Sequence, residues 1–160
     1  MPRRDSVNLI RDIGVDPLYG SAVVQKLINL IMWRGKKNVA RLIAYDALGV
    51  VAKKAGGGPE KTLKMFYKAI EQVTPAVEVK SRRVGGGVYQ VPTEVSERRA
   101  QSLALRWLVQ AASKRGAKTM GRGLGDELCD AAEGRGGACK RRLEVHKMAE
   151  ANRAFNHYSW

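Results

Sequence analysis

The sequence predicts a mainly α-helical protein, a bundle of six helices with one protruding β-hairpin arm. Apolar residues recur with a helical period of about 3.6 in six segments, and between residues 76 and 95 the period changes to about 2, as in strands. The chain has 160 residues, of which 44% are hydrophobic. This length is typical of one domain, and the apolar content is sufficient for a core. We therefore expect a single domain over residues 1–160.

The first twenty residues show no sustained periodicity and are interrupted by proline and glycine. We expect an extended basic arm over residues 1–20, in which Arg3, Arg4 and Arg11 are available to bind phosphate. A frayed terminus without a binding role explains the same segment equally well.

Three helices are predicted in the first half of the chain, over residues 21–34, 39–55 and 59–74, with a short basic turn at 36–38 between the first two. Ser21 is suited to the N-cap of the first helix, and the three glycines at 56–58 are suited to the end of the second. Their apolar stripes indicate faces that pack in the core rather than line a ligand pocket.

The alternating segments on either side of Gly85–Gly87 predict a β-hairpin with a three-residue loop. The expected pairs are Val77 with Val95, Val79 with Thr93, Ser81 with Val91 and Arg83 with Tyr89. This register gathers the alternating apolar residues on one face, whereas a two-residue loop at 86–87 would mix both faces. It leaves Glu78 opposite Glu94. Because Pro92 lacks an amide donor, we expect an edge strand in a free-standing two-stranded arm whose outer end gains order from a partner.

Three more helices follow the hairpin. One runs from Ser96 to about Lys114, and its apolar arc is wide enough to place it centrally. Its polar stripe carries the following residues: Arg99, Ser102, Arg106, Gln110 and Ser113. A weaker helix is predicted over 119–133, because Gly121, Gly123 and Gly125 each cost up to about 1 kcal/mol relative to alanine. The C-terminal segment, residues 139–160, is predicted to form a helix from about Cys139 to Phe155 and a short tail.

The net charge indicates a polyanionic partner. Lys and Arg number 29 against 15 Asp and Glu, which gives 29 − 15 = +14. Nucleic acid is the leading partner class and an anionic membrane surface the other. No apolar run approaches the roughly 20 residues of a membrane span, and the N-terminus lacks the apolar region of a signal peptide.

Basic residues recur at the ends of the predicted elements, where the ends of packed helices can share one surface. The candidate RNA-binding residues are Arg3, Arg4, Arg34, Lys36, Lys37, Lys80, Arg82, Arg83, Gly85, Gly86, Tyr89, Arg98, Arg99, Arg106, Lys114, Arg115, Lys118 and Arg142. The guanidinium group can bind phosphate oxygens with two hydrogen bonds, and glycine lets a backbone strand approach closely. Tyr89 could stack on a base or on an arginine, or simply pack on the hairpin.

The residues favour RNA over DNA. Architectural DNA-binding proteins carry apolar wedges at the tips of their arms. Here the tip reads Val-Gly-Gly-Gly-Val beside arginines, which suits contact with an irregularly folded RNA. A DNA-binding architectural protein is the alternative.

Enzymatic and metal-binding functions have little support in the sequence. The two cysteines, Cys129 and Cys139, form no ligand pattern with His146 or His157, so we expect structural thiols in a reduced, intracellular protein. The glycines at 121–125 follow no strand and therefore do not indicate a dinucleotide site. We expect no cofactor, no metal and no catalytic residue.

Five blocks of the sequence are similar to the bacterial-type small-subunit ribosomal protein S-seven family. They are VEVKSRRVGGGVYQVPTEV at 77–95, INLIMWRGKK at 28–37, SLALRWLVQAA at 102–112, DAAEGRGGA at 130–138 and HKMAEANRAFNHYSW at 146–160. The resemblance runs from about Asp16 to the C-terminus, in order and with similar spacing.

The resemblance implies a non-enzymatic protein of the small subunit, in a bacterial cytoplasm or an organelle. It implies direct binding to the 3′ major domain of the rRNA and nucleation of head assembly. It places the hairpin and the adjacent C-terminal region near the exit-site tRNA and the mRNA path, with protein S-eleven as a neighbour. The residues it assigns to RNA contact are Arg3, Arg4, Lys36, Lys37, Arg82, Arg83, Gly85, Gly86, Arg98, Arg99, Lys114 and Arg115. Asp5 and Asp12 make the arm less basic than in many relatives.

Overall fold

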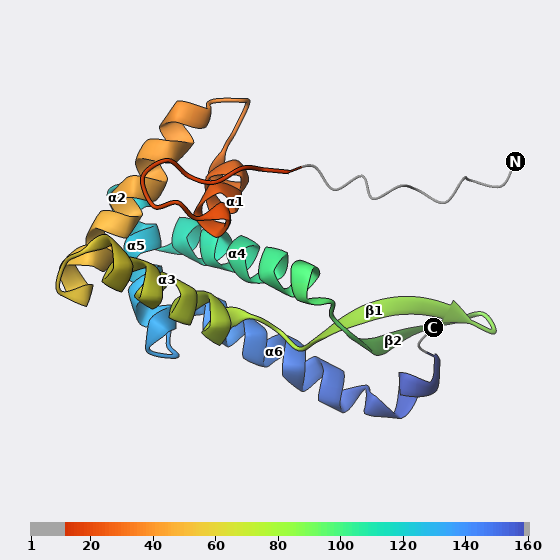
Figure 1. Cartoon of the computed structure of the whole chain (residues 1–160). Helices are drawn as coiled ribbons and strands as arrows, with labels where there is room; N and C mark the ends of the chain where they lie inside the picture. Colours follow the sequence, from red (N-terminus) through yellow and green to blue (C-terminus); the bar gives the residue numbers. More distant parts are fainter. Residues whose placement is uncertain (1–11, 159–160) are drawn as a thin grey trace, which may run out of the picture.

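The computed structural model describes residues 12–158, so the arm cations Arg3, Arg4 and Arg11 lie outside the described residues. The elements in chain order are α1 (Ala22–Ile31), α2 (Lys37–Ala55), α3 (Pro59–Val73), β1 (Val77–Val84), β2 (Gly87–Glu94), α4 (Glu97–Lys114), α5 (Met120–Ala132), α6 (Gly137–Ala151) and a short 3₁₀ helix, η1 (Arg153–Tyr158). The helices pack into one body, from which the two strands extend as an arm (Figure 1). The predicted mainly α fold with a hairpin is confirmed.

The core is centred on α5, which packs against α2, α3, α4 and α6. Leu124 and Leu128 of α5 are buried with Leu48 of α2, Phe66 of α3 and Leu108 of α4. These side chains come from the apolar stripes seen in the sequence. The stripes are therefore core faces, as predicted.

The glycines of α5 do not disrupt the helix, which is regular over its whole length. Their absent side chains allow close packing. A Cβ atom on Gly125 would lie 2.6 Å from Val50 Cβ, and one on Gly121 would lie 2.7 Å from Asp46 Cβ, both on α2. A Cβ atom on Gly123 would lie 3.2 Å from the carbonyl oxygen of Ala112 on α4. The low helix propensity of glycine is thus offset by contacts that no other residue permits.

The described part of the N-terminal segment, residues 12–20, departs from the predicted extended arm. The chain turns at residues 17–19, and the Asp16 side chain is fully buried. Its carboxylate accepts hydrogen bonds from the backbone N–H groups of Leu18 and Tyr19 and from the hydroxyl group of Tyr45 on α2, the last at 2.8 Å. Sequence periodicity could not reveal this attachment, because it depends on one side chain that closes a turn.

The hairpin register differs from the predicted one. Val84 pairs with Gly87 across a two-residue turn at Gly85 and Gly86, whose φ angles are +56° and +90°. Two consecutive positive φ angles form a type I′ turn, whose twist matches that of paired strands. This register places Thr93, not Glu94, opposite Glu78 and so removes the like-charge pair.

The predicted single apolar face is also wrong, because the base of the hairpin is covered on both faces. Val91 is fully buried, whereas Val79, which points to the opposite face, lines a groove with Trp107 of α4 and Met148 of α6. A period of 2 identifies one buried face only when the other face meets water.

The C-terminus supports the arm, which is therefore not free-standing. Helix α6 ends at Ala151 rather than at the predicted Phe155, and the Asn152 side chain donates a 2.7 Å hydrogen bond to the Met148 carbonyl. The chain continues as η1, which packs on β2. The ring centres of Phe155 and Tyr158 lie 5.1 and 5.7 Å from that of Tyr89.

The close packing of α5 on α2 predicts opposite effects for two glycine substitutions. Gly125→Ala introduces a Cβ atom 2.6 Å from Val50 Cβ, and we expect it to lower the free energy of unfolding by about 1–2 kcal/mol in spite of the better helix propensity of alanine. Gly49→Ala in α2 has open space around its Cβ and should raise stability by up to about 1 kcal/mol. Urea unfolding measures both. Stabilisation by both substitutions would contradict the proposed packing role.

The environment of His146 predicts that the stability of the protein depends on pH. Its Nε2 atom accepts a 3.3 Å hydrogen bond from the backbone N–H group of Ala76, at the start of the hairpin. Burial, with a smaller contribution from the Arg142 guanidinium, lowers the pKa of His146 below its ordinary value. The unfolded chain therefore binds the proton more readily, so stability is complete above a pH of about 6.5 and falls as the pH drops toward the folded-state pKa.

The measurement is the urea midpoint between about pH 7 and pH 5. His146→Gln retains a hydrogen-bond acceptor but does not titrate, so its midpoint should depend less on pH than that of the wild type. His157→Gln, at an exposed position of η1, is the matched control, because it removes the other histidine and keeps the acceptor of the Ala76 hydrogen bond. Identical pH profiles for the wild type and His146→Gln would rule out the assigned role.

Candidate nucleic-acid interface

A cationic groove lies between α1 and α4, and we call it the α1–α4 groove. It has a volume of about 270 Å³ and is lined by Ile13, Lys26, Asn29, Leu30, Arg98, Ser102, Leu105 and Arg106. Lys26 comes from α1, and the two arginines come from α4. The Lys26 ammonium group donates a 2.7 Å hydrogen bond to the side chain of Gln101, which joins the two helices. None of these lining residues is acidic.

The predicted polar stripe of α4 is exposed, and its Ser102 and Arg106 line the α1–α4 groove, but Arg98 rather than Arg99 lies there with them. Arg98, Ser102 and Arg106 are spaced four residues apart and line the α1–α4 groove. Arg99 points instead to the hairpin, where its Nε atom lies 2.9 and 2.8 Å from the two carboxylate oxygens of Glu78. Arg99 therefore anchors the arm to α4.

Lys80 contributes to the same anchor, with its ammonium group 3.0 Å from Glu78. Burial raises the pKa of Glu78, but the hydrogen bonds from Lys80 and Arg99 outweigh burial and lower it overall. Glu78 is therefore a buried anion with two cationic partners. This arrangement sets the direction of the hairpin at its base.

The connection between α1 and α2 and the first residue of α2 present three exposed cations, Arg34, Lys36 and Lys37. The backbone N–H group of Lys36 donates a 3.1 Å hydrogen bond to the Trp33 carbonyl, which closes a tight turn. Arg34 and Gly35 have φ angles of +50° and +76°, so this is also a type I′ turn. The predicted basic turn at 36–38 thus lies earlier in the chain, because Lys37 and Asn38 already belong to α2.

At the tip of the hairpin, Gly85, Gly86 and Arg83 are exposed. Tyr89 pairs with Arg82 rather than with Arg83. The Tyr89 ring is half-buried against Phe155 and Tyr158, so packing within the protein accounts for much of its surface.

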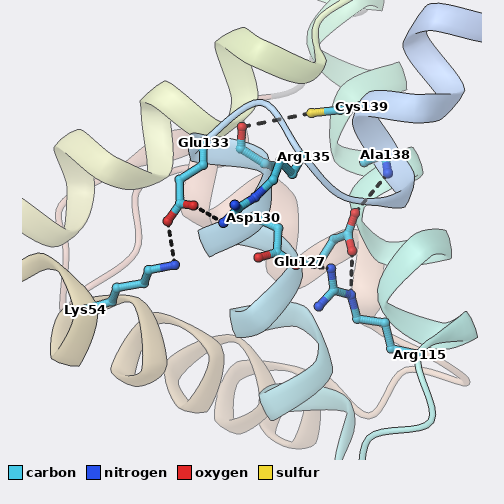
Figure 2. Close-up of polar contacts among 9 residues, drawn as sticks. Lys54, Arg115, Glu127, Asp130, Glu133, Arg135, Ala138 and Cys139 are labelled. Atoms are coloured by element: carbon cyan, nitrogen blue, oxygen red, sulfur yellow. Dashed lines mark hydrogen bonds and ion pairs between the residues drawn. The ribbon is translucent and has the colours of Figure 1, made fainter.

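Arg115 is half-buried and pairs with carboxylates of the protein itself. Its Nε atom lies 2.6 Å from the carboxylate of Glu127, a side chain that is only 1% exposed, and its guanidinium group also binds Asp130 (Figure 2). The other oxygen of Glu127 accepts a 2.9 Å hydrogen bond from the backbone N–H group of Ala138. Burial lowers the pKa of Arg115, but the two carboxylates outweigh this effect and raise it overall. Arg115 thus links the end of α4 to α5 and α6.

The remaining candidates lie at the far end of α4 and on α6. Lys114 and Lys118 are exposed, whereas Arg142 is half-buried. Lys114 lines a second groove of about 670 Å³ between α4 and α6, but Glu127 and Glu144 line it too. This mixed charge suits a polyanion less well than the α1–α4 groove does.

The described residues contain no cluster of three potential metal ligands, and both cysteines are buried free thiols whose pKa values are raised by burial. Glu144 forms an ion pair with Arg141, at 3.0 Å. None of the described helices is long and apolar enough to cross a membrane.

Comparison with known families matches residues 2–153 to the family described as ribosomal protein S7p/S5e. The chain belongs to this family. Similar proteins include the small ribosomal subunit proteins uS7 of Nitrosospira multiformis, 54% identical over 99% of both chains, of Photobacterium profundum, 51% identical over the full length of both, and of Ruminiclostridium cellulolyticum, 49% identical over the full length of both.

Membership in the S7p/S5e family makes the chain a structural, non-enzymatic component of the small ribosomal subunit. It implies small-subunit rRNA and other ribosomal proteins as partners. The resemblance seen in the sequence is thereby confirmed.

Two residues were missing from the sequence-based candidates: Lys26, which lines the α1–α4 groove, and Trp33, which lies at the α1–α2 turn. One signal was available: between residues 17 and 45 the sequence has five Lys or Arg and no Asp or Glu. An acid-free segment this long indicates a surface that avoids carboxylates, and both residues lie within it.

The contrast between Arg115 and its neighbour Lys114 is testable. We expect Arg115→Ala to lower the free energy of unfolding by about 3 kcal/mol, because it leaves the buried Glu127 carboxylate without its cation. Lys114→Ala, at an exposed position, should change it by less than about 0.5 kcal/mol. Chemical denaturation compares the two, and equal losses would show that Arg115 is not the internal link.

Proposed function

We propose that the protein binds the 3′ major domain of small-subunit rRNA directly, nucleates assembly of the subunit head, and lies near the exit-site tRNA and the mRNA path. The observation that carries the proposal is the α1–α4 groove, with cations on both walls and no acidic lining residue. The family assignment identifies the polyanion as rRNA, and the groove supplies the place where phosphates would be neutralised.

The chemistry of the groove suits a ribose-phosphate backbone. Arg98 and Arg106 can each bind phosphate oxygens through two N–H groups, and Lys26 faces them from α1. Ser102 and Asn29 supply neutral hydrogen-bonding groups for sugar or phosphate oxygens. Positions on rigid helices hold these groups in place before RNA arrives, which lowers the entropy lost on binding.

The hairpin supplies a second contact. Exposed Gly85 and Gly86 have no side chains to keep an RNA strand away, and exposed Arg83 adds a cation. The anchors at Glu78 and at Tyr89 fix the arm at its base and along β2. Because η1 packs on β2, the arm and the C-terminal region form one surface. We place the tRNA, the mRNA path and protein S-eleven beside it, as the family resemblance implies.

The other cationic candidates take two roles in this proposal. Phosphate contacts outside the groove come from Arg34, Lys36 and Lys37 near the α1–α2 turn, from Lys114 and Lys118 at the far end of α4, from Arg142 on α6, and from Arg3 and Arg4 of the arm. Lys80, Arg99 and Arg115 have carboxylate partners and position the binding elements.

The salt dependence of RNA binding tests which cations contact phosphate. The triple variant Arg83→Gln, Arg98→Gln, Arg106→Gln removes three exposed cations, and we expect the slope of log K against log salt to become shallower by about 0.7–0.9 per lost contact. The matched control Lys61→Gln, Lys64→Gln, Lys68→Gln removes three exposed cations of α3 and should leave the slope nearly unchanged. Equal changes in both would mean that only net charge matters.

The competing function is that of an architectural DNA-binding protein. Competition at physiological salt between the 3′ major domain transcript and duplex DNA of equal length separates the two. We expect the transcript to displace the DNA, and preference for the duplex would overturn the proposal.

In reconstitution of the subunit, omission of the protein should leave the head unassembled while the other domains form.

A further inference from the structure

Trp33 is unusually exposed for a tryptophan. Its exposed fraction is 75%, whereas that of Trp107 in α4 is 8%. Water contact with a large indole surface is unfavourable, so such exposure often marks a binding surface. Neither the family match nor the basic candidates account for it.

The backbone holds Trp33 in this exposed position. Its carbonyl group accepts the 3.1 Å hydrogen bond from Lys36 that closes the type I′ turn between α1 and α2. Arg34, the next residue, has a φ angle of +50°, the only positive value among the described non-glycine residues. Left-handed backbone is uncommon for arginine, and such conformations often occur at functional sites. The exposure is therefore built into an ordered turn.

Trp33 is also one wall of a small groove between this turn and α2. The groove has a volume of about 200 Å³ and is lined by Ile31, Trp33, Arg34, Lys36, Val39, Ala40 and Ile43. Its lining is apolar except for two cations, and none of these residues is acidic. The volume is below the roughly 300–1,000 Å³ of pockets for drug-sized ligands. It suits a single planar ring whose neighbouring group is anionic.

We infer that Trp33 stacks on one unpaired base of the bound RNA, while Arg34 and Lys36 bind the adjacent phosphates. The inference rests on the proposed function and adds a base contact to its phosphate contacts. An aromatic face accepts any base, and unpaired bases are the parts of folded RNA that side chains reach most readily. An apolar side chain of a protein partner would also fill the groove, but it would not use the two cations. The acid-free surroundings favour the nucleotide.

Affinity for the 3′ major domain transcript tests the stacking directly. Trp33→Ala should weaken binding on the order of 5- to 100-fold and leave the salt slope unchanged, because indole carries no charge. Trp33→Phe keeps an aromatic ring and should retain most of the affinity. Arg34→Gly suits the positive φ angle and should make the slope shallower by about 0.7–0.9. Leu143→Ala, at a 52% exposed position of α6, is the control and should bind as the wild type does.

A second measurement reports on Trp33 itself. In the full chain with Trp107→Phe and Trp160→Phe, Trp33 is the remaining tryptophan, and we expect saturating transcript or a short single-stranded RNA to quench its emission. Wild-type affinity of Trp33→Ala would overturn the inference, as would unchanged emission at saturation. A defect of Trp33→Ala confined to binding another ribosomal protein would overturn it as well.

The two probes separate this inference from the proposed function. If the transcript binds without quenching Trp33, the inference fails and the proposed function stands. If the transcript does not bind but single-stranded RNA quenches Trp33, the proposed function fails and the stacking role stands.

Discussion

The close approach of α5 to α2 is the constraint on which the rest of the structure depends. It is possible because Gly121 and Gly125 have no side chains. A Cβ atom at either position would collide with Asp46 or Val50 of α2. With α5 held there, the buried Glu127 carboxylate fixes Arg115 at the end of α4 and the first turn of α6. The position of α4 in turn sets one wall of the α1–α4 groove and, through Arg99, the base of the hairpin.

The same interactions determine where the excess of positive charge lies on the protein. Two buried carboxylates, Glu78 and Glu127, pair with cations at the base of the arm and in the helical body, and Asp130 and Glu133 pair with cations nearer the surface. The segment from 17 to 45 has no carboxylate, and it supplies the α1 wall of the groove and the α1–α2 turn. Carboxylates thus stabilise the contacts among α4, α5, α6 and the hairpin base, whereas the cations of the α1–α4 groove and the α1–α2 turn remain available to a polyanion. Net charge alone could not show this separation.

The sequence predicted what depends on local patterns. The helices and the existence of the hairpin follow from periodicity, and the cationic ends of the elements follow from composition. It could not predict the hairpin register, which depends on the φ angles of Gly85 and Gly86 and on packing against both faces of the arm. The sequence predicted only a weak helix for α5. Helix propensity counts the cost of each glycine but does not include the close contact with α2 that requires glycine there.

For the binding site, too, the sequence predicted which residues are cationic but not which partner each of them contacts. Arg98 and Arg99 are adjacent in the sequence, but they point to different partners, because successive helical residues differ in direction by about 100°. Arg115 resembles any other basic residue at a helix end until the buried Glu127 is placed beside it. The exposure of Trp33 depends on a turn formed by an arginine with positive φ, which no sequence pattern indicates.

The central claim is that rRNA contacts the α1–α4 groove and the hairpin rather than the helical body in general. The most direct test is ultraviolet cross-linking of the protein assembled on small-subunit rRNA, with cross-linked residues located by mass spectrometry. The account predicts nucleotide adducts on the α1–α2 turn, on α4 between Arg98 and Arg106 and near the hairpin tip, and few on the exposed lysines of α3. Adducts concentrated on α3, with the groove unmodified, would contradict it.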